Sequence, residues 1–136
     1  MITRFRKVTL IRVKRPKKSS LNEELQWFSH SLGLFSSRDK EKSCFRIFLE
    51  LLKSTKKGKG LTSDEIAEKS HLSRGTVIYH INRLAEQGFV IIEDGKYKLR
   101  VDNLGELVRL IQQDLKSIFK ELKDMAEELD KELKNY

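Results

Sequence analysis

The 136-residue chain has little cysteine, proline and tryptophan, with one residue of each. The single cysteine, Cys44, excludes an intramolecular disulfide and a zinc site made of thiolates alone. No apolar run approaches the roughly 18 residues that a membrane-spanning helix requires. The basic N-terminus has no unbroken apolar segment of the kind found in signal peptides. We therefore expect a soluble, cytoplasmic protein that needs neither a disulfide nor a metal to fold.

Charge is abundant and unevenly distributed. The chain has 28 Lys and Arg residues against 20 Asp and Glu residues, which gives a net charge of +8. Residues 1–60 hold 16 basic and 5 acidic side chains, net +11, whereas residues 61–100 hold six of each and are neutral. Residues 101–136 hold 6 basic and 9 acidic side chains, net −3. This distribution favours a polyanionic partner near the front of the chain.

The first 60 residues predict a basic segment followed by two helices. Residues 4–13 mix basic, β-branched and aromatic side chains, and predict a short strand that ends before Pro16. This strand has three interpretations: it pairs with a second copy or with a later hairpin, it lies along DNA as a basic arm, or it is unstructured. Helical spacing predicts helices over 22–30 and about 38–55, the second capped by Ser36 or Ser37.

The region 61–101 has the clearest local signals. Thr62 and Glu65 have the spacing of a capping box and predict a short helix. Ser73 predicts the start of a helix over 74–87, and Gly88 predicts its end. Two β-rich runs, 89–92 and 97–101, flank an Asp-Gly pair that is typical of a tight hairpin turn. Helix, turn, helix and hairpin is the order of a winged helix-turn-helix.

Residues 61–90 resemble the ArsR-like winged-helix transcription regulators, especially their archaeal members. With looser similarity in the preceding helix, the resemblance covers roughly 40 of the 136 residues. It follows the pattern Ser-x-x-Thr-Val-x-x-His-x-x-x-Leu-x-x-x-Gly-hydrophobic, which begins at Ser73. The resemblance implies DNA binding and transcription regulation. The chain departs from the metal-sensing branch, because it has no paired thiolates near the helix over 74–87 and no histidine pair in its final helix.

The helix expected over 74–87 has an apolar and a polar face. At about 100° per residue, Val77, Ile81 and Leu84 share one sector, which we expect to pack inward. His80 flanks this sector and is expected to pack beside it, with contact to a DNA phosphate as the alternative. Glu86 would repel phosphate, so the N-terminal half should enter the major groove. The predicted DNA-binding residues have donors, acceptors, an aromatic edge or a bare backbone; they are Ser73, Arg74, Gly75, Thr76, Tyr79, Asn82, Arg83, Lys96 and Lys98.

The tail predicts one helix from Asn103 to about Lys134, about 48 Å long at about 1.5 Å per residue. Apolar residues in it alternate at spacings of 4 and 3, a 3.5-residue repeat that is typical of a coiled coil. We expect this seam to pair two copies of the chain, with packing against the chain's own helices as the alternative, or both together. The predicted dimerisation residues are Leu104, Val108, Ile111, Leu115, Ile118, Leu122, Met125 and Leu129.

The sequence gives little support for catalysis. The three histidines are scattered, and the glycines at 58 and 60 lack the spacing of a phosphate-binding loop. We predict a protein that is not an enzyme and has no metal or cofactor. Cys44 is expected in the core, with a redox role as the alternative. The aromatic residues Trp27, Phe28 and Phe35 are expected to be core, with an apolar effector pocket as the alternative.

Together these patterns predict a mainly α fold with a small β-hairpin wing and a long C-terminal dimerisation helix. We expect a basic arm over 1–20, a winged helix-turn-helix domain over 21–101 and a coiled-coil helix over 102–136. The predicted function is that of a homodimeric, nucleoid-associated regulator of transcription that binds palindromic double-stranded DNA. We expect it to repress transcription by steric occlusion. The alternatives are a protein-interaction scaffold and an architectural protein that binds DNA without sequence preference.

Overall fold

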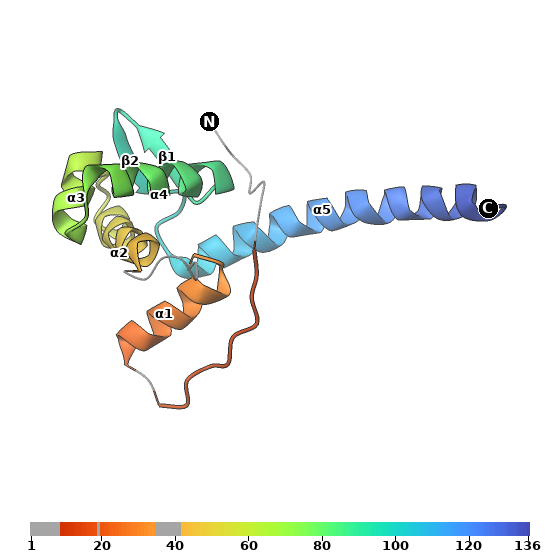
Figure 1. Ribbon diagram of the computed structural model, residues 1–136, viewed down its shortest axis with the longest axis horizontal. Helices are drawn as coiled ribbons and strands as arrows, with labels where there is room; N and C mark the ends of the chain where they lie inside the picture. The colour runs from red at the N-terminus through yellow and green to blue at the C-terminus, as the bar shows by residue number, and fades with distance from the viewer. Residues whose placement is uncertain (1–8, 19, 35–41) are drawn as a thin grey trace.

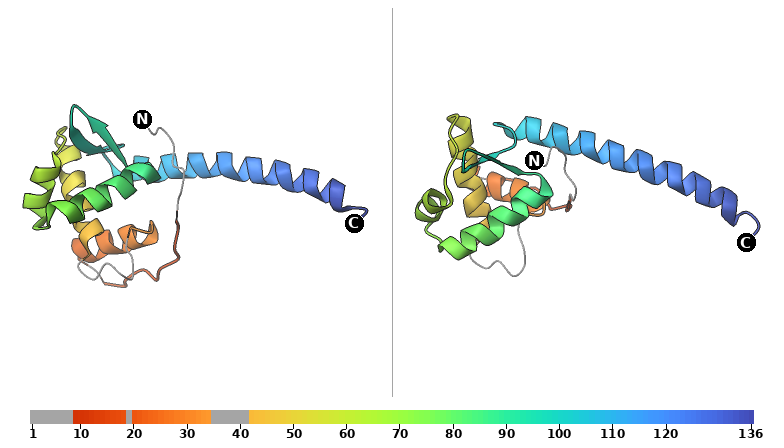
Figure 2. Two further views of the ribbon diagram at one scale, coloured as in Figure 1. Left: turned by 45° about the horizontal axis from the view of Figure 1, so that its top comes forward. Right: turned by 90° about the horizontal axis from the view of Figure 1, so that it is seen from above.

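The computed structural model describes residues 9–18, 20–34 and 42–136, and these contain five helices and one β-hairpin. The hairpin lies at one end of the domain and the first helix at the other, with the second and fourth helices between them (Figure 1). The last helix extends away from the domain (Figures 1 and 2). In chain order the elements are α1 (Leu21–Ser31), α2 (Ser43–Lys56), α3 (Ser63–Ser70), α4 (Arg74–Gln87), β1 (Val90–Glu93), β2 (Lys96–Leu99) and α5 (Leu104–Leu133).

Side-chain caps define where most of the helices begin. Thr62 and Glu65 form the predicted capping box of α3, and the Ser73 hydroxyl accepts from the Thr76 amide at the start of α4. Asn103 caps α5 in the same way. The end of α4 is also as predicted, because Gly88 adopts the left-handed conformation with φ of 94°.

The start of α2 differs from the prediction. Within the described residues this helix begins at Ser43, after Lys42, which has a left-handed φ of 56° and provides no side-chain cap. The serines at 36 and 37 that were expected to cap it lie outside the described residues. The hydroxyl pattern alone therefore gave too early a start for this helix.

The predicted N-terminal strand is wrong for the part of it that the structure describes. Residues 9–13 form no strand, and the first half of the expected strand lies outside the described residues. Instead the Ile11 amide donates to the Ser31 carbonyl oxygen at 2.9 Å, and Trp27 Nε1 donates to the Val13 carbonyl oxygen at 2.9 Å. These hydrogen bonds with α1 satisfy backbone groups that a sheet would otherwise pair.

The wing is a two-stranded antiparallel hairpin in which Val90 pairs with Leu99 and Glu93 with Lys96. Both central turn residues, Asp94 and Gly95, have positive φ, of 51° and 73°, which matches the predicted Asp-Gly turn. The strands are displaced by one or two residues from those expected. Leu61 adds a bridge to Tyr97, so the chain entering α3 is joined to the wing.

One hydrophobic core joins α2, α3, α4, the hairpin and the start of α5. Leu107 is 1% exposed and lies in this core, although the 3.5-residue pattern did not include it. The predicted seam of α5 is therefore divided between two surroundings. Leu104, Ile111 and Leu115 pack in or against the chain's own core, Ile118 is half-buried, and Val108, Leu122, Met125 and Leu129 are exposed.

We predict that Leu107→Ala lowers the free energy of unfolding by about 2–5 kcal/mol, because it removes a buried side chain and leaves a cavity. The matched control is Leu21→Ala, the same chemical change at a side chain that is 72% exposed. Its effect should be within about 0.5 kcal/mol. Urea unfolding of both variants measures the difference. Equal losses would show that α5 is not anchored through Leu107.

Candidate nucleic-acid interface

Helix α4 presents one face to the core and the opposite face to solvent. Val77, Ile81 and Leu84 are buried, as predicted. His80 is also buried, so it packs beside this sector. On the other side Tyr79 is 59% exposed. This face of α4 is therefore not covered by any residue that the structure describes. Its exposed polar side chains, besides Tyr79, are Arg74, Asn82, Arg83 and Glu86. Gly75 is also exposed, and Thr76 is half-buried.

Contacts between neighbouring side chains order the exposed face of α4. The Arg83 guanidinium lies 5.7 Å from the centroid of the Tyr79 ring, a cation–π distance. The same ring meets the His80 ring edge-on, with centroids 5.1 Å apart. Because His80 is buried, it helps to hold Tyr79 against the helix surface. Arg83 is thus supported by an aromatic face and keeps its guanidinium edge available to a ligand.

The N-terminal end of α4 is polar and open. Ser73 Oγ accepts from the Thr76 amide at 3.2 Å and donates to Thr76 Oγ1 at 2.8 Å, so this serine is first of all the helix cap. Arg74 Nε lies 3.5 Å from a carboxylate oxygen of Asp64, and both side chains are well exposed. A Cβ atom placed on Gly75 would meet no atom within 4 Å. The backbone of this turn is therefore accessible to a large partner.

Residues 49–91 match the family model described as winged helix-turn-helix DNA-binding. The fold is a winged helix-turn-helix. The matched residues include α3, α4 and the first residues of the wing, so the match supports a DNA-binding role for this domain. No curated protein and no solved structure matches the chain.

The two predicted wing lysines have different surroundings. Lys96, next to the turn, is exposed. Lys98 is half-buried, and its Nζ lies 3.4 Å from a carboxylate oxygen of Glu93 on the paired strand. Lys96 is therefore the more available of the two for an anion.

Sequence reasoning missed a groove of about 750 Å³ between the end of α2, α3 and the wing. Its signal was the run Lys56-Lys57-Gly58-Lys59-Gly60, of which only the glycine spacing was considered. Six lysines line this groove; they are Lys53, Lys57, Lys59, Lys69, Lys96 and Lys98.

A smaller cavity of about 290 Å³ lies between residues 15–16, α1 and the first residue of α5. Phe28 packs against the core, as expected. Trp27 and Phe28 also line this cavity, where the alternative places an apolar pocket, and Phe35 lies outside the described residues. Arg15 lies over the Trp27 ring at 5.6 Å. Cys44, half-buried, packs against the core as expected.

The described part of the chain contains no group of three or more His, Cys, Asp or Glu side chains that could hold a metal ion. No helix within the described ranges has the length and apolar character needed to cross a membrane.

The capping box of α3 predicts a pH dependence of stability. Hydrogen bonds with Thr62, above all from its backbone amide, and the nearby positive charges of Lys96 and Lys69 hold the pKa of Glu65 below 4.5. A lowered pKa in the folded state stabilises the fold above the unfolded-state pKa, and this contribution is lost as the pH falls below about 4.5.

We expect Glu65→Gln to reduce the loss of stability on acidification, because glutamine can accept the Thr62 hydrogen bond without titrating. Urea unfolding at about pH 6 and about pH 3 measures the change for the variant and the wild type. A difference between the two proteins that is the same at both pH values would contradict this role for Glu65.

Proposed function

We propose that this chain is a sequence-specific regulator of transcription that binds double-stranded DNA through α4. The observation that carries the proposal is the uncovered polar face of α4 on a domain whose fold matches the winged helix-turn-helix DNA-binding family. The resemblance of residues 61–90 to the ArsR-like regulators, in particular the archaeal ones, supports a narrower family assignment. Cytoplasmic location in association with the nucleoid follows from this function.

The chemistry of α4 supports a division between base and phosphate contacts. Arg83 and Asn82 provide the groups that pair with the major-groove edges of guanine and adenine. Thr76 and Tyr79 offer hydroxyls, and the backbone at Gly75 can approach a phosphate closely. Phosphate contacts of this kind position the helix, and the base contacts give sequence preference. The proposed surface also includes Ser73 and Arg74 at the start of α4, and Lys96 and Lys98 of the wing.

The exposed apolar stripe of α5 supports a homodimer. Phe119 is 65% exposed, and Leu122, Met125, Leu129 and Leu133 continue the stripe along the projecting half of the helix. Apolar residues repeated every 3.5 positions bury their side chains when a second helix with the same pattern pairs with them. A two-fold dimer places two copies of α4 on one duplex and therefore favours a palindromic site. Repression follows if the bound dimer blocks access of other proteins to that DNA.

Arg83→Ala should weaken binding to the preferred duplex by about 10- to 100-fold, because it removes a base contact worth about 1–3 kcal/mol. Binding measured by fluorescence anisotropy on a site selected from a random duplex pool provides the test. The matched control is Glu86→Ala, one turn further along the same exposed face, which should keep or improve the affinity because it removes a negative charge. Unchanged affinity in Arg83→Ala would exclude the assigned orientation of α4.

The same titrations distinguish the two alternative functions. A sequence-specific regulator keeps a preference for the selected duplex over random DNA as salt rises, whereas an architectural protein shows no such preference. A protein-interaction scaffold would bind neither duplex.

The double variant Leu122→Glu/Leu129→Glu should convert the dimer to a monomer with a folded domain, because four buried carboxylates would face one another in the paired helices. The control is Gln113→Glu/Ser117→Glu, which adds the same charge on the side of α5 away from the stripe. Sedimentation equilibrium should give the mass of one chain for the first variant and of two chains for the control. A wild-type protein that is monomeric at all concentrations would contradict the proposed assembly.

A further inference from the structure

The lysine-rich groove between the end of α2, α3 and the wing, called the lysine groove below, lies beside a region of the domain that has no net charge. Residues 61–100, which include α3, α4 and the wing, have no net charge. At the wing itself, Glu93 and Asp94 balance Lys96 and Lys98. A neutral surface gains little affinity from phosphate neutralisation, which dominates most protein–DNA interactions. Most of the positive charge for the DNA backbone must therefore come from residues outside this region.

The end of α2 and the loop after it provide that charge next to the wing. Lys53, Lys57 and Lys59 face the same groove as Lys69 of α3 and Lys96 of the wing. The loop is held close to the wing, since a Cβ atom on Gly60 would lie only 2.7 Å from Lys96 Cβ. The following residue, Leu61, exchanges two backbone hydrogen bonds with Tyr97, of 2.9 and 2.7 Å. These contacts fix the loop lysines relative to the wing.

Three of the four acidic residues that line the groove have partners within the domain, and the fourth, Asp94, lies in the wing turn. Glu50 lies 3.4 Å from Lys53, and Glu93 lies 3.4 Å from Lys98. Glu65 accepts the hydrogen bond of the Thr62 amide at 3.0 Å. In contrast, Lys57, Lys59 and Lys69 form no direct ion pair with any residue that the structure describes, although Lys69 is near enough to Glu65 to lower the pKa of that carboxyl. Three ammonium groups in one groove are thus available to external anions.

We propose that this groove is a second DNA-contacting surface, in which Lys57, Lys59 and Lys69 bind backbone phosphates beside the duplex segment contacted by the wing. The proposal rests on the proposed function and extends it, because Lys96 belongs to both surfaces and makes them continuous. An ammonium group is a point charge that binds phosphate without reading a base. The groove therefore increases affinity for any sequence and leaves base selection to α4.

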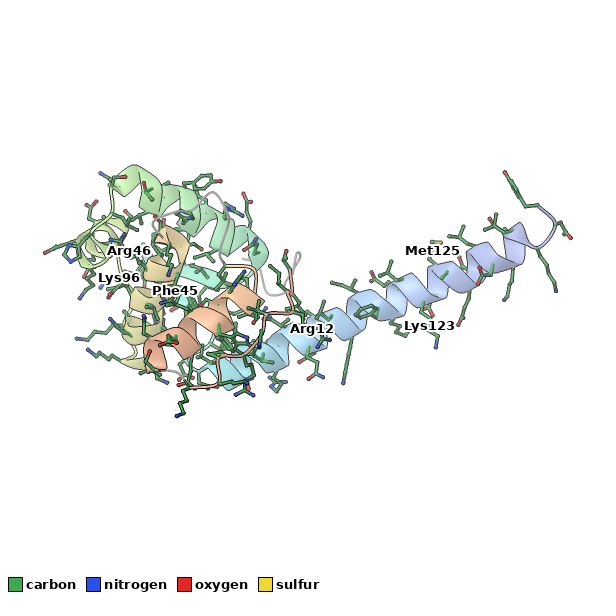
Figure 3. The ribbon with its side chains drawn as sticks, turned by 60° about the horizontal axis from the view of Figure 1, so that its bottom comes forward. Arg12, Phe45, Arg46, Lys96, Lys123 and Met125 are labelled. Carbon is green, nitrogen blue, oxygen red and sulfur yellow. The ribbon has the colours of Figure 1, made fainter. Side chains whose placement is uncertain are left out.

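The test compares two triple variants with the same loss of charge. The first, Lys57→Gln/Lys59→Gln/Lys69→Gln, removes the three groove charges. The control, Lys116→Gln/Lys120→Gln/Lys123→Gln, removes three exposed charges from α5. Lys96 lies on the domain and Lys123 on the projecting helix, so the two sets of substitutions are well separated (Figure 3). Affinity for the selected duplex and for random duplex is measured over a range of salt concentrations.

The affinity of the groove variant should depend less steeply on salt. The magnitude of its slope of log K against log salt should fall by about 0.9 for each phosphate contact removed, up to about 2.7 in total. Its preference for the selected duplex over random DNA should stay unchanged, and the control should keep the wild-type slope. Identical slopes in the two variants would overturn the proposal while leaving the function of α4 intact. A loss of preference in the groove variant would also overturn it.

Two further results separate the sources of phosphate and the two proposals. If the wild type binds inorganic pyrophosphate, and the groove variant loses this binding but keeps its DNA slope, the groove binds free anions and the proposal is overturned. If the wild type binds no duplex at all, both the proposed function and the groove assignment fail. If only Arg83→Ala behaves as expected, the proposed function stands and the groove assignment fails.

Discussion

The burial of Val77, Ile81 and Leu84 is the constraint on which the rest of the structure depends. Because these side chains share one sector of α4, their packing against the core determines the rotation of the helix about its axis. The opposite sector, with Tyr79 and Arg83, must then face solvent. Both ends of α4 are fixed by local chemistry, a serine cap and a left-handed glycine. The exposed face of α4 is thus a consequence of core packing and capping.

Most of the excess positive charge and the exposed apolar stripe lie in other parts of the chain than α4. The region that contains α3, α4 and the wing is neutral, whereas the preceding residues hold most of the excess positive charge. In the proposed account, α4 provides specificity and the lysines at the end of α2 provide attraction to the backbone. The last helix, α5, has two functions along its length. Its first turns complete the core through Leu107, and in the proposed account the apolar stripe of its projecting half pairs with a second copy.

Local signals predicted most of the fold, because each depends on a few adjacent residues. The capping box at Thr62, the Asp94-Gly95 turn and the inward sector of α4 are of this kind. Features that depend on distant contacts were not predictable in the same way. The chain at 9–13 looked like a strand, but its hydrogen bonds go to α1. The lysine groove requires the loop after α2 to meet the wing. Leu107 is buried because the face of α5 that contacts the domain overlaps the first part of the 3.5-residue seam but also includes Leu107 beside it.

The most direct measurement for the central claim is an amide chemical-shift map of the full chain, recorded by NMR as a selected duplex is added. The account predicts that the largest changes fall at the solvent-facing positions of α4 and at the wing turn. Smaller changes should follow in the loop after α2, with the projecting half of α5 unaffected. Changes confined to α1 and α5, with the amides around Tyr79 and Arg83 unperturbed, would contradict the assignment of α4 as the helix that binds DNA.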